Sequence, residues 1–283
     1  MATVAVMTAS SNSGAQCVES LVAAGAPTRA IFRSEEKAAA CRAKYGDAVQ
    51  VVSGVNAVTL DATLVSAFEG ATFAVIVTPH YDFAKDAELT CNMIKAASQA
   101  GVSHVVFVGS WTVAQPDCTI AKRFVPSETL LQTLPIKWTS LRSGYFSGNY
   151  AALFQGPQVF FPDVAVPPVD PKDIGRVAAA ICLNPENHDK QFYQISGPEQ
   201  LTTSQIVEKV SKATGRTFEY HAVPVAALKP PAPPLFLIEL LQYIDAHGLV
   251  CSPITKELTG IHTSFDDYLA ANLQAFMPPT KAD

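Results

Sequence analysis

The first thirty-odd residues constrain the fold of this chain most. An apolar run at residues 3–7 (TVAVM) precedes a stretch of small residues, 8–14 (TASSNSG), and then a segment with apolar side chains at helical spacing. A second strand-like run follows at residues 28–32 (TRAIF). A strand, a turn of small residues, a helix and a strand in this order form the βαβ unit that opens a dinucleotide-binding fold.

The turn departs from the glycine-rich pattern of such folds. Aligned with G-x-x-G-x-x-G, its three key positions are Thr8, Ser11 and Gly14, and only the last is glycine. Thr8 and Ser11 carry a Cβ where glycine lets the backbone approach a phosphate, but their hydroxyl groups can donate hydrogen bonds to it. The alternative is an ordinary turn of an α/β protein. The residues expected to hold a pyrophosphate at the helix N-terminus are Thr8, Ser10, Ser11, Asn12, Ser13 and Gly14.

Arg33 closes the second predicted strand, 19 residues after Gly14. A site specific for NAD places Asp or Glu near this point to accept a hydrogen bond from the ribose 2′-OH, whereas an arginine accommodates a 2′-phosphate. The sequence therefore predicts NADP(H) as the cofactor. The alternative is a solvated arginine at the end of a strand.

The alternation of strand and helix continues along the chain. Further apolar runs typical of strands lie at residues 49–52, 73–77, 105–108 and 138–141. Helical patterns lie between them at residues 35–45, 61–70 and 82–100. These patterns predict an α/β fold with a doubly wound parallel sheet of Rossmann type.

Beyond about residue 150 the regular alternation fades. Residues 158–168 are rich in Pro and Phe, and the remaining patterns indicate helices beginning near 171, 202 and 235 and strands at 192–195 and 217–220. We predict a dinucleotide-binding core, residues 1–150, and a smaller mixed α/β C-terminal lobe, residues 151–283, which roofs a substrate cleft. The boundary between them is expected to be soft and interleaved.

Composition excludes several classes of protein. Hydrophobic residues make up 48% of the chain and charged residues 16%, which is typical of a folded globular protein. No apolar run is long enough to span a membrane, and the N-terminus lacks the features of a signal peptide. Six cysteines without C-x-x-C pairs indicate reduced thiols in a cytoplasmic protein and no metal site. The net charge of −5, without a run of Lys or Arg, argues against nucleic-acid binding.

Further passages carry a family resemblance. They are residues 96–108 (AASQAGVSHVVFV), residues 134–142 (LPIKWTSLR) with the following Gly144, Phe146 and Asn149, and residues 264–268 (SFDDY) after Thr259 and Gly260. With the opening βαβ unit and Arg33, the chain resembles the NmrA-like family, an atypical branch of the short-chain dehydrogenase/reductase superfamily, over nearly its whole length. The resemblance implies a Rossmann core that binds NADP(H) and a small lobe that forms a cleft. The family includes reductases of quinones, isoflavones and related compounds, and regulators that bind the dinucleotide without turning it over.

Lys122 is the first candidate for catalysis. It lies twelve residues before Leu134, and by resemblance it would hydrogen-bond the nicotinamide ribose and stabilise charge near the reacting carbonyl. Cys118 stands where ordinary short-chain dehydrogenases have a proton-donating tyrosine. Because Pro126 disfavours a continuous helix, we expect the helix to begin near Pro126 and Lys122 to lie on a loop before it. The alternative is a surface lysine without a role.

The ends of three later strands supply the other candidates. By resemblance, Thr78 and Pro79 cover the adenine ribose and pyrophosphate, and Tyr81 or His80 reaches the substrate. Tyr145 and Phe146 follow the sixth strand near the expected nicotinamide, where Tyr145 either packs on the ring or donates a proton. The predicted catalytic residues are Lys122, Tyr81 and Tyr145, and the predicted cofactor contacts beyond the first turn and Arg33 are Thr78, Pro79, Ser110, Lys122, Tyr145 and Phe146. The remaining histidines are expected to be structural.

Three functions are compatible with these features. The first is an NADPH-dependent oxidoreductase that reduces a small carbonyl, quinone or enone-type substrate by hydride transfer. The second is a non-catalytic, redox-sensing regulator that binds NADP(H), which Cys118 and the altered turn favour. The third is a scaffold or a binder of another ligand, if Thr8 and Ser11 abolish dinucleotide binding. The apolar C-terminal third also allows a homodimer.

Overall fold

The computed structural model describes residues 2–80, 83–231 and 233–278. The chain folds into two compact units, each assembled from three stretches of sequence. The first unit comprises Met1–Ser143, Pro171–Gln194 and Ile254–Gly260. The second comprises Gly144–Asp170, Ile195–Pro253 and Ile261–Asp283.

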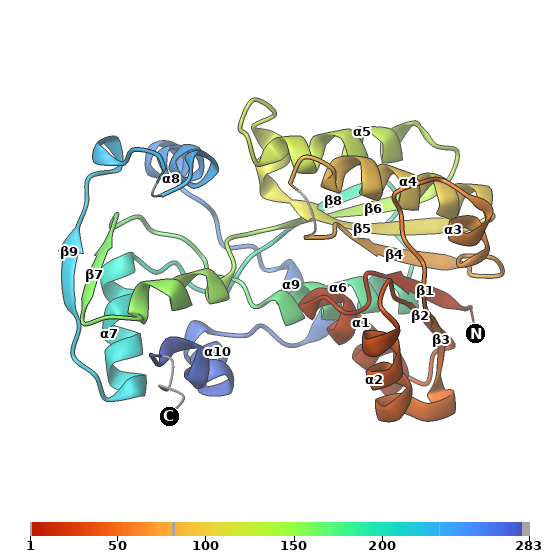
Figure 1. Ribbon diagram of the computed structural model, residues 1–283, viewed down its shortest axis with the longest axis horizontal. Coiled ribbons are helices and arrows are strands. Elements are labelled where there is room, and N and C mark those ends of the chain that lie inside the picture. The colour runs from red at the N-terminus through yellow and green to blue at the C-terminus, as the bar shows by residue number, and fades with distance from the viewer. Residues whose placement is uncertain (1, 81–82, 232, 279–283) are drawn as a thin grey trace. The chain divides into compact units, whose positions relative to one another are not determined.

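A seven-stranded sheet with the order β3-β2-β1-β4-β5-β6-β8 forms the centre of the first unit (Figure 1). Its strands are β1 (Val4–Met7), β2 (Thr28–Ile31), β3 (Val49–Val52), β4 (Phe73–Val77), β5 (His104–Ser110), β6 (Lys137–Ser143) and β8 (Gln191–Ile195). Every pairing from β3 to β6 is parallel. The order reverses between β1 and β4, which is where doubly wound sheets bind ligands beyond the carboxyl ends of the strands. The predicted Rossmann-type sheet is confirmed.

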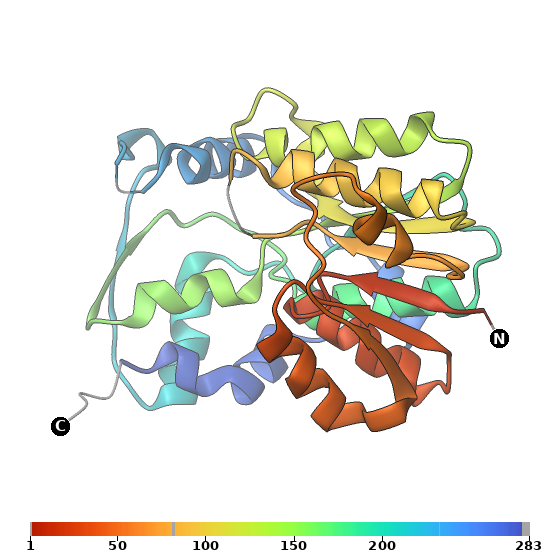
Figure 2. The same ribbon diagram turned by 45° about the vertical axis from the view of Figure 1, so that its right-hand side comes forward.

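Helices cover both faces of this sheet, which explains why its central strands are continuously apolar. Figures 1 and 2 show α3, α4 and α5 over one face and α1, α2 and α6 over the other. The helices of this unit are α1 (Asn12–Ala23), α2 (Glu35–Tyr45), α3 (Ala62–Ser66), α4 (Asp86–Gln99), α5 (Val125–Thr133), α6 (Pro171–Leu183) and α9 (Ile254–Thr259). Short 3₁₀ helices are η1 (Gly46–Ala48), η2 (Trp111–Ala114) and η3 (Ala121–Arg123). The main core lies between the sheet and α4, where Ile76, Ile94 and Phe107 are fully buried.

The start of α5 confirms one expectation from the sequence. Pro126 occupies the first turn of this helix, where its missing N–H group costs nothing because that group would have no intrahelical acceptor. Lys122 therefore lies outside the helix, in η3. The helix expected from residue 82 begins at Asp86 instead.

Helices α1 and α6 approach each other closely at Gly175. A Cβ built on Gly175 would lie 2.2 Å from the Ser13 carbonyl oxygen and 2.8 Å from the Cys17 amide nitrogen. Both are backbone atoms of α1, the helix that follows the first turn. The position therefore requires glycine, which lets α1 and α6 pack closely against each other.

The second unit combines a small sheet with helices. Strands β7 (Gln158–Phe161) and β9 (Glu219–Ala222) pair in parallel. The helices are α7 (Thr203–Thr214), α8 (Leu235–His247), α10 (Phe265–Asn272) and the 3₁₀ helices η4 (Ser147–Phe154), η5 (Val225–Ala227) and η6 (Leu273–Phe276). Its core is aromatic, with Tyr150, Phe154, Phe265 and Phe276 almost fully buried. The mixed α/β character predicted for this part of the chain is confirmed, although β7 lies in a segment for which no strand is predicted.

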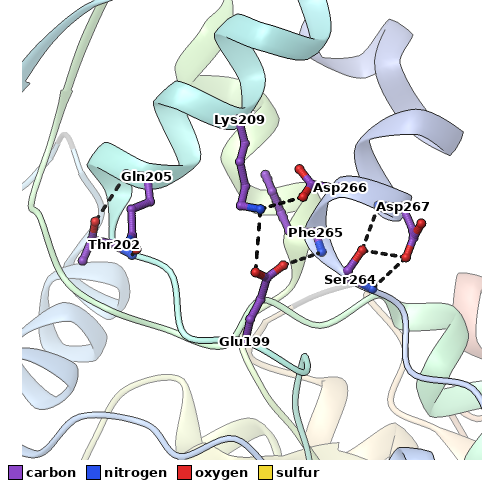
Figure 3. A network of polar contacts seen from close by, with 8 residues as sticks. All are labelled: Glu199, Thr202, Gln205, Lys209, Ser264, Phe265, Asp266 and Asp267. Atoms are coloured by element: carbon purple, nitrogen blue, oxygen red, sulfur yellow. Dashed lines mark hydrogen bonds and ion pairs between the residues drawn. The ribbon is translucent and has the colours of Figure 1, made fainter.

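A polar network joins α7 to α10 within the second unit (Figure 3). Lys209 Nζ lies 2.6 Å from Asp266 Oδ2 and 3.7 Å from Glu199 Oε2, and the Phe265 amide donates to Glu199 Oε1 at 3.2 Å. Both helices begin with a capping box, formed by Thr202 with Gln205 and by Ser264 with Asp267. The network fixes the start of α10 against α7. None of the helices in the described part of the chain is long and apolar enough to cross a membrane.

Candidate functional site

The turn between β1 and α1 has the geometry of a glycine loop without two of its glycines. Thr8 has a φ of 62°, in the left-handed region that β-branched residues rarely adopt. The Ser11 hydroxyl donates to the Thr8 carbonyl at 2.9 Å and accepts from the Gly14 amide at 3.0 Å, so it caps α1. A Cβ on Gly14 would lie 2.5 Å from the Thr8 carbonyl oxygen, which explains why this glycine is present.

This geometry corrects one expectation about the hydroxyl groups. The proton of Ser11 is engaged by the Thr8 carbonyl, so Ser11 shapes the turn and does not offer a donor to a phosphate. The backbone N–H groups of Asn12 and Ser13 lie in the first turn of α1, where a helix offers no intrahelical acceptor for them. The positive end of the helix dipole lies there as well.

Thr8→Gly is expected to stabilise the protein by about 1 kcal/mol, because glycine adopts a positive φ without the steric cost of a branched Cβ. Urea unfolding of the variant and the wild type measures the difference. Thr59→Gly is the control, since Thr59 is an exposed loop residue whose φ is not in this region, and it should be neutral or destabilising. A Thr8→Gly variant less stable than the wild type contradicts the assignment of strain to this turn.

A cavity of about 480 Å³ opens at the carboxyl ends of β1, β2 and β4. Thr8, Ser10 and Ser11 form one polar wall, and Arg33 faces the same space from the end of β2. The apolar wall of the cavity consists of Val55, Ala57, Val58, Leu89 and Met93. A site that combines an N-terminal helix turn, an arginine and an apolar wall suits a ligand with separate anionic and ring portions.

Hydrogen bonds fix the apolar wall. Asn92 Nδ2 on α4 donates to the carbonyl oxygen of Ala57 at 2.9 Å and to that of Val58 at 3.4 Å. The Asn56 side chain accepts from the Val58 amide at 3.2 Å. The loop after β3 is therefore tied to a helix of the core.

Arg123 and Asp86 lie behind the segment that follows β4, and the sequence patterns did not identify them. Their side chains are 3% and 1% exposed, and Arg123 Nη2 lies 2.6 Å from Asp86 Oδ2. Arg123 Nη2 also donates to the Pro79 carbonyl at 3.3 Å, and Nη1 lies 3.5 Å from His80 Nε2. Pro79 and His80 line the cavity. A buried ion pair thus supports one of its walls.

Three further predicted site residues of the first unit, Thr78, Ser110 and Lys122, do not line the cavity. Thr78 is buried and donates from its hydroxyl to the Val108 carbonyl at 3.4 Å, so it joins β4 to β5. Ser110 accepts from the Thr112 amide at 3.3 Å and caps η2. Lys122 is exposed on η3 and is not among the residues that line the cavity. Tyr81 lies outside the described residues.

Tyr145 and Phe146 belong to the second unit. Tyr145 is buried, its ring centroid lies 5.4 Å from that of Tyr150, and burial raises the pKa of its hydroxyl to about 12. Phe146 forms a bridge with Val169. Of the site residues predicted from the sequence, the structure brings together in one cavity Thr8, Ser10, Ser11, Arg33, Pro79 and His80.

The described residues contain no group of three or more His, Cys, Asp or Glu side chains that could hold a metal ion. His104 is an example of a structural histidine, because its Nε2 lies 2.9 Å from Thr139 Oγ1 and burial lowers its pKa to about 4. None of the six cysteines, which all lie in the described part of the chain, forms a disulfide bond.

Comparisons with known proteins show which sequences this chain is similar to. The model of the NmrA-like family matches residues 1–269. A (4-alkanoyl-5-oxo-2,5-dihydrofuran-3-yl)methyl phosphate reductase of Streptomyces griseus is 28% identical over 200 residues, which are 65% of this chain and 71% of that protein. An NAD(P)H azoreductase of Xenophilus azovorans is 27% identical over 224 residues, 76% of this chain and 75% of the relative.

The fold is also similar to that of solved structures. The NADPH-dependent quinone oxidoreductase QOR2 of Escherichia coli, solved in complex with NADPH, superposes with a TM-score of 0.80. The match covers 95% of this chain and 99% of that chain at 23% sequence identity, so it shows the fold alone. The family model, which spans most of the sequence, shows more: this chain belongs to the NmrA-like family.

Proposed function

We propose that this protein is an NADP(H)-dependent reductase of a small molecule. The observation that carries the proposal is the cavity in which the polar turn at the start of α1 and Arg33 face the same space. These two features match the two anionic parts of NADP(H), its pyrophosphate and its 2′-phosphate. The relatives named as an NAD(P)H azoreductase and as a (4-alkanoyl-5-oxo-2,5-dihydrofuran-3-yl)methyl phosphate reductase support the same activity.

The residues present fit the dinucleotide. Gly14 allows the turn to close tightly before α1, because a Cβ at this position would collide with the Thr8 carbonyl oxygen. The N-terminal N–H groups of α1 would hold the pyrophosphate, with Thr8 and Ser10 beside them. Arg33 would pair with the 2′-phosphate, and the apolar wall after β3 would cover the adenine ring.

Bound NADPH supplies the hydride, and the protein contributes position and a proton. Tyr145 is the first candidate for the proton donor from its place in the sequence, although burial raises its pKa to about 12 and so makes its hydroxyl a weaker acid than that of an ordinary tyrosine. Lys122 is the second candidate for a catalytic residue. Its role would be to bind the nicotinamide ribose or to stabilise charge on the substrate oxygen. The proposed substrates are small carbonyl, quinone or enone-type compounds. A cytoplasmic location and a homodimer stay predictions from the sequence.

Wild-type protein is expected to oxidise NADPH in the presence of at least one member of a panel of quinones, enones and carbonyl compounds. Tyr145→Phe and Lys122→Met should each lower kcat by about 100-fold if the residue donates the proton or stabilises the charge on the substrate oxygen. Lys212→Met, at an exposed position on α7, is the control and should leave kcat unchanged. Absence of turnover by the wild type across the whole panel contradicts the reductase proposal.

A second candidate function is a non-catalytic regulator that binds NADP(H). Lys122 is exposed on η3 and does not line the cavity, and Cys118 occupies the position of the usual tyrosine. Such a regulator must bind oxidised and reduced cofactor with different affinities, because a ligand shifts a conformational equilibrium only through differential affinity. Equal affinities for NADP and NADPH, measured by calorimetry, rule it out.

A further inference from the structure

The ion pair behind the cavity wall holds a guanidinium in a fixed place. Arg123 Nη2 and Nε lie 2.6 and 3.0 Å from the same oxygen of Asp86, Oδ2. The guanidinium carbon is 4.8 Å from the ring centroid of Phe83 and 5.3 Å from that of Phe124. A buried cation that is paired with a carboxylate and stacked on aromatic rings has little freedom to reorient.

One edge of this guanidinium faces His80. Arg123 Nη1 lies 3.5 Å from His80 Nε2, a long hydrogen bond in which arginine can only donate. His80 Nε2 must therefore accept, and an imidazole that accepts at Nε2 carries its proton at Nδ1. His80 is exposed and helps to line the cavity. Its Nδ1–H group is consequently the donor that His80 can offer to a ligand.

The charges around His80 favour this neutral form. Partial burial lowers the pKa of His80, the Arg123 guanidinium lowers it further, and the Asp86 carboxylate opposes them. His80 is thus neutral at pH 7, and the neutral imidazole already carries the Nδ1–H group that donates.

We propose that Asp86 and Arg123 are positioning residues that hold His80 as a neutral hydrogen-bond donor, through Nδ1–H, to an oxygen of the dinucleotide in the cavity. The inference rests on the proposed function, because it assigns a further contact to the same cofactor. It gives the buried ion pair a role in recognition beyond stability. It also gives His80 a role as a cofactor contact and not as an acid or base.

The tautomer can be measured without any cofactor. In ¹⁵N-labelled protein, long-range ¹H–¹⁵N spectra distinguish an imidazole protonated at Nδ1 from one protonated at Nε2. We expect the Nδ1–H form for His80 at pH 7 and a titration midpoint below the ordinary value of 6.5. An Nε2–H imidazole, or a protonated one at pH 7, overturns the inference.

Two substitutions of His80 test the contact to the cofactor. The amide nitrogen of asparagine falls near the position of Nδ1, whereas that of glutamine falls near Nε2. His80→Asn should therefore bind NADPH within about twofold of the wild type, and His80→Gln should bind it about fivefold to tenfold more weakly, the range of one hydrogen bond. Equal affinities of the two variants for NADPH overturn the inference.

The role of the ion pair is tested in the double variant Arg123→Met, Asp86→Asn, which removes both charges together. We expect His80 to change to the Nε2–H tautomer and the NADPH affinity to fall as in His80→Gln. Retention of the Nδ1–H form shows that the pair does not set the tautomer. If wild-type protein does not bind NADPH at all, the proposed function and the ligand contact are overturned, whereas the tautomer still reports on the positioning by Arg123.

Discussion

Replacing Gly175 by alanine is expected to destabilise the protein by about 3 kcal/mol, which is at the upper end of the usual cost of overpacking. The new Cβ would lie 2.2 Å from the Ser13 carbonyl oxygen, so α1 or α6 must move as a whole. The intrinsic preference of helices for alanine, about 1 kcal/mol over glycine, offsets part of this cost. Because α1 supplies the turn at the cavity, weaker NADPH binding should accompany the loss of stability.

Urea unfolding followed by circular dichroism measures this effect. Gly156→Ala is a matched control, since a Cβ at Gly156 meets no atom within 4 Å and its φ is not positive. The control should change the free energy of unfolding by less than about 0.5 kcal/mol, as surface substitutions usually do. A Gly175→Ala variant as stable as the wild type contradicts the close approach of the two helices.

Arg123→Met is expected to destabilise the protein by about 3–5 kcal/mol, because it leaves the carboxylate of Asp86 buried without its guanidinium partner. The carboxylate is 1% exposed, and water cannot replace the lost charge without opening the structure. Asp86 also begins α4, where a negative charge is stabilised by the helix dipole, and this limits the loss.

Addition of Asp86→Asn to Arg123→Met separates stability from positioning. The double variant should regain much of the lost free energy of unfolding, since no buried charge is left without a partner. Its NADPH affinity should stay low, because Pro79 and His80 have lost the donor that holds them. If affinity recovers together with stability, the pair supports only the fold.

The sheet of the first unit could be predicted because buried parallel strands are continuous apolar runs. Residues 73–77 match β4 to the residue, and the helix expected at residues 35–45 matches α2. Strands β5 and β6 extend beyond their apolar runs, from His104 paired with Lys137 to Ser110 paired with Ser143. Backbone hydrogen bonds continue there although the side chains are polar. The apolar runs alone therefore predict strands that are too short at both ends.

The supports of the cavity could not be predicted in the same way. Asp86 and Arg123 are 37 residues apart, and no periodic pattern marks a buried arginine. The position of the segment after β4 indicated a ligand-binding edge, but not what holds that segment. Thr8 and Ser11 were recognised as substitutes for glycine, whereas the positive φ of Thr8 and the engaged proton of Ser11 depend on the fold of the turn.

Calorimetric titration of NADPH, NADP, NADH and NAD into wild type and Arg33→Ala tests the central claim most directly. The wild type should bind NADPH more tightly than NADH, and Arg33→Ala should weaken NADPH binding by about 10- to 100-fold, the range of a charged hydrogen bond, with little effect on NADH. Arg42→Ala is the control, because Arg42 is an exposed arginine on α2 that pairs with Glu35 and does not line the cavity. Equal binding of NADPH and NADH by the wild type, or an unchanged NADPH affinity in Arg33→Ala, contradicts the assignment of this cavity to NADP(H).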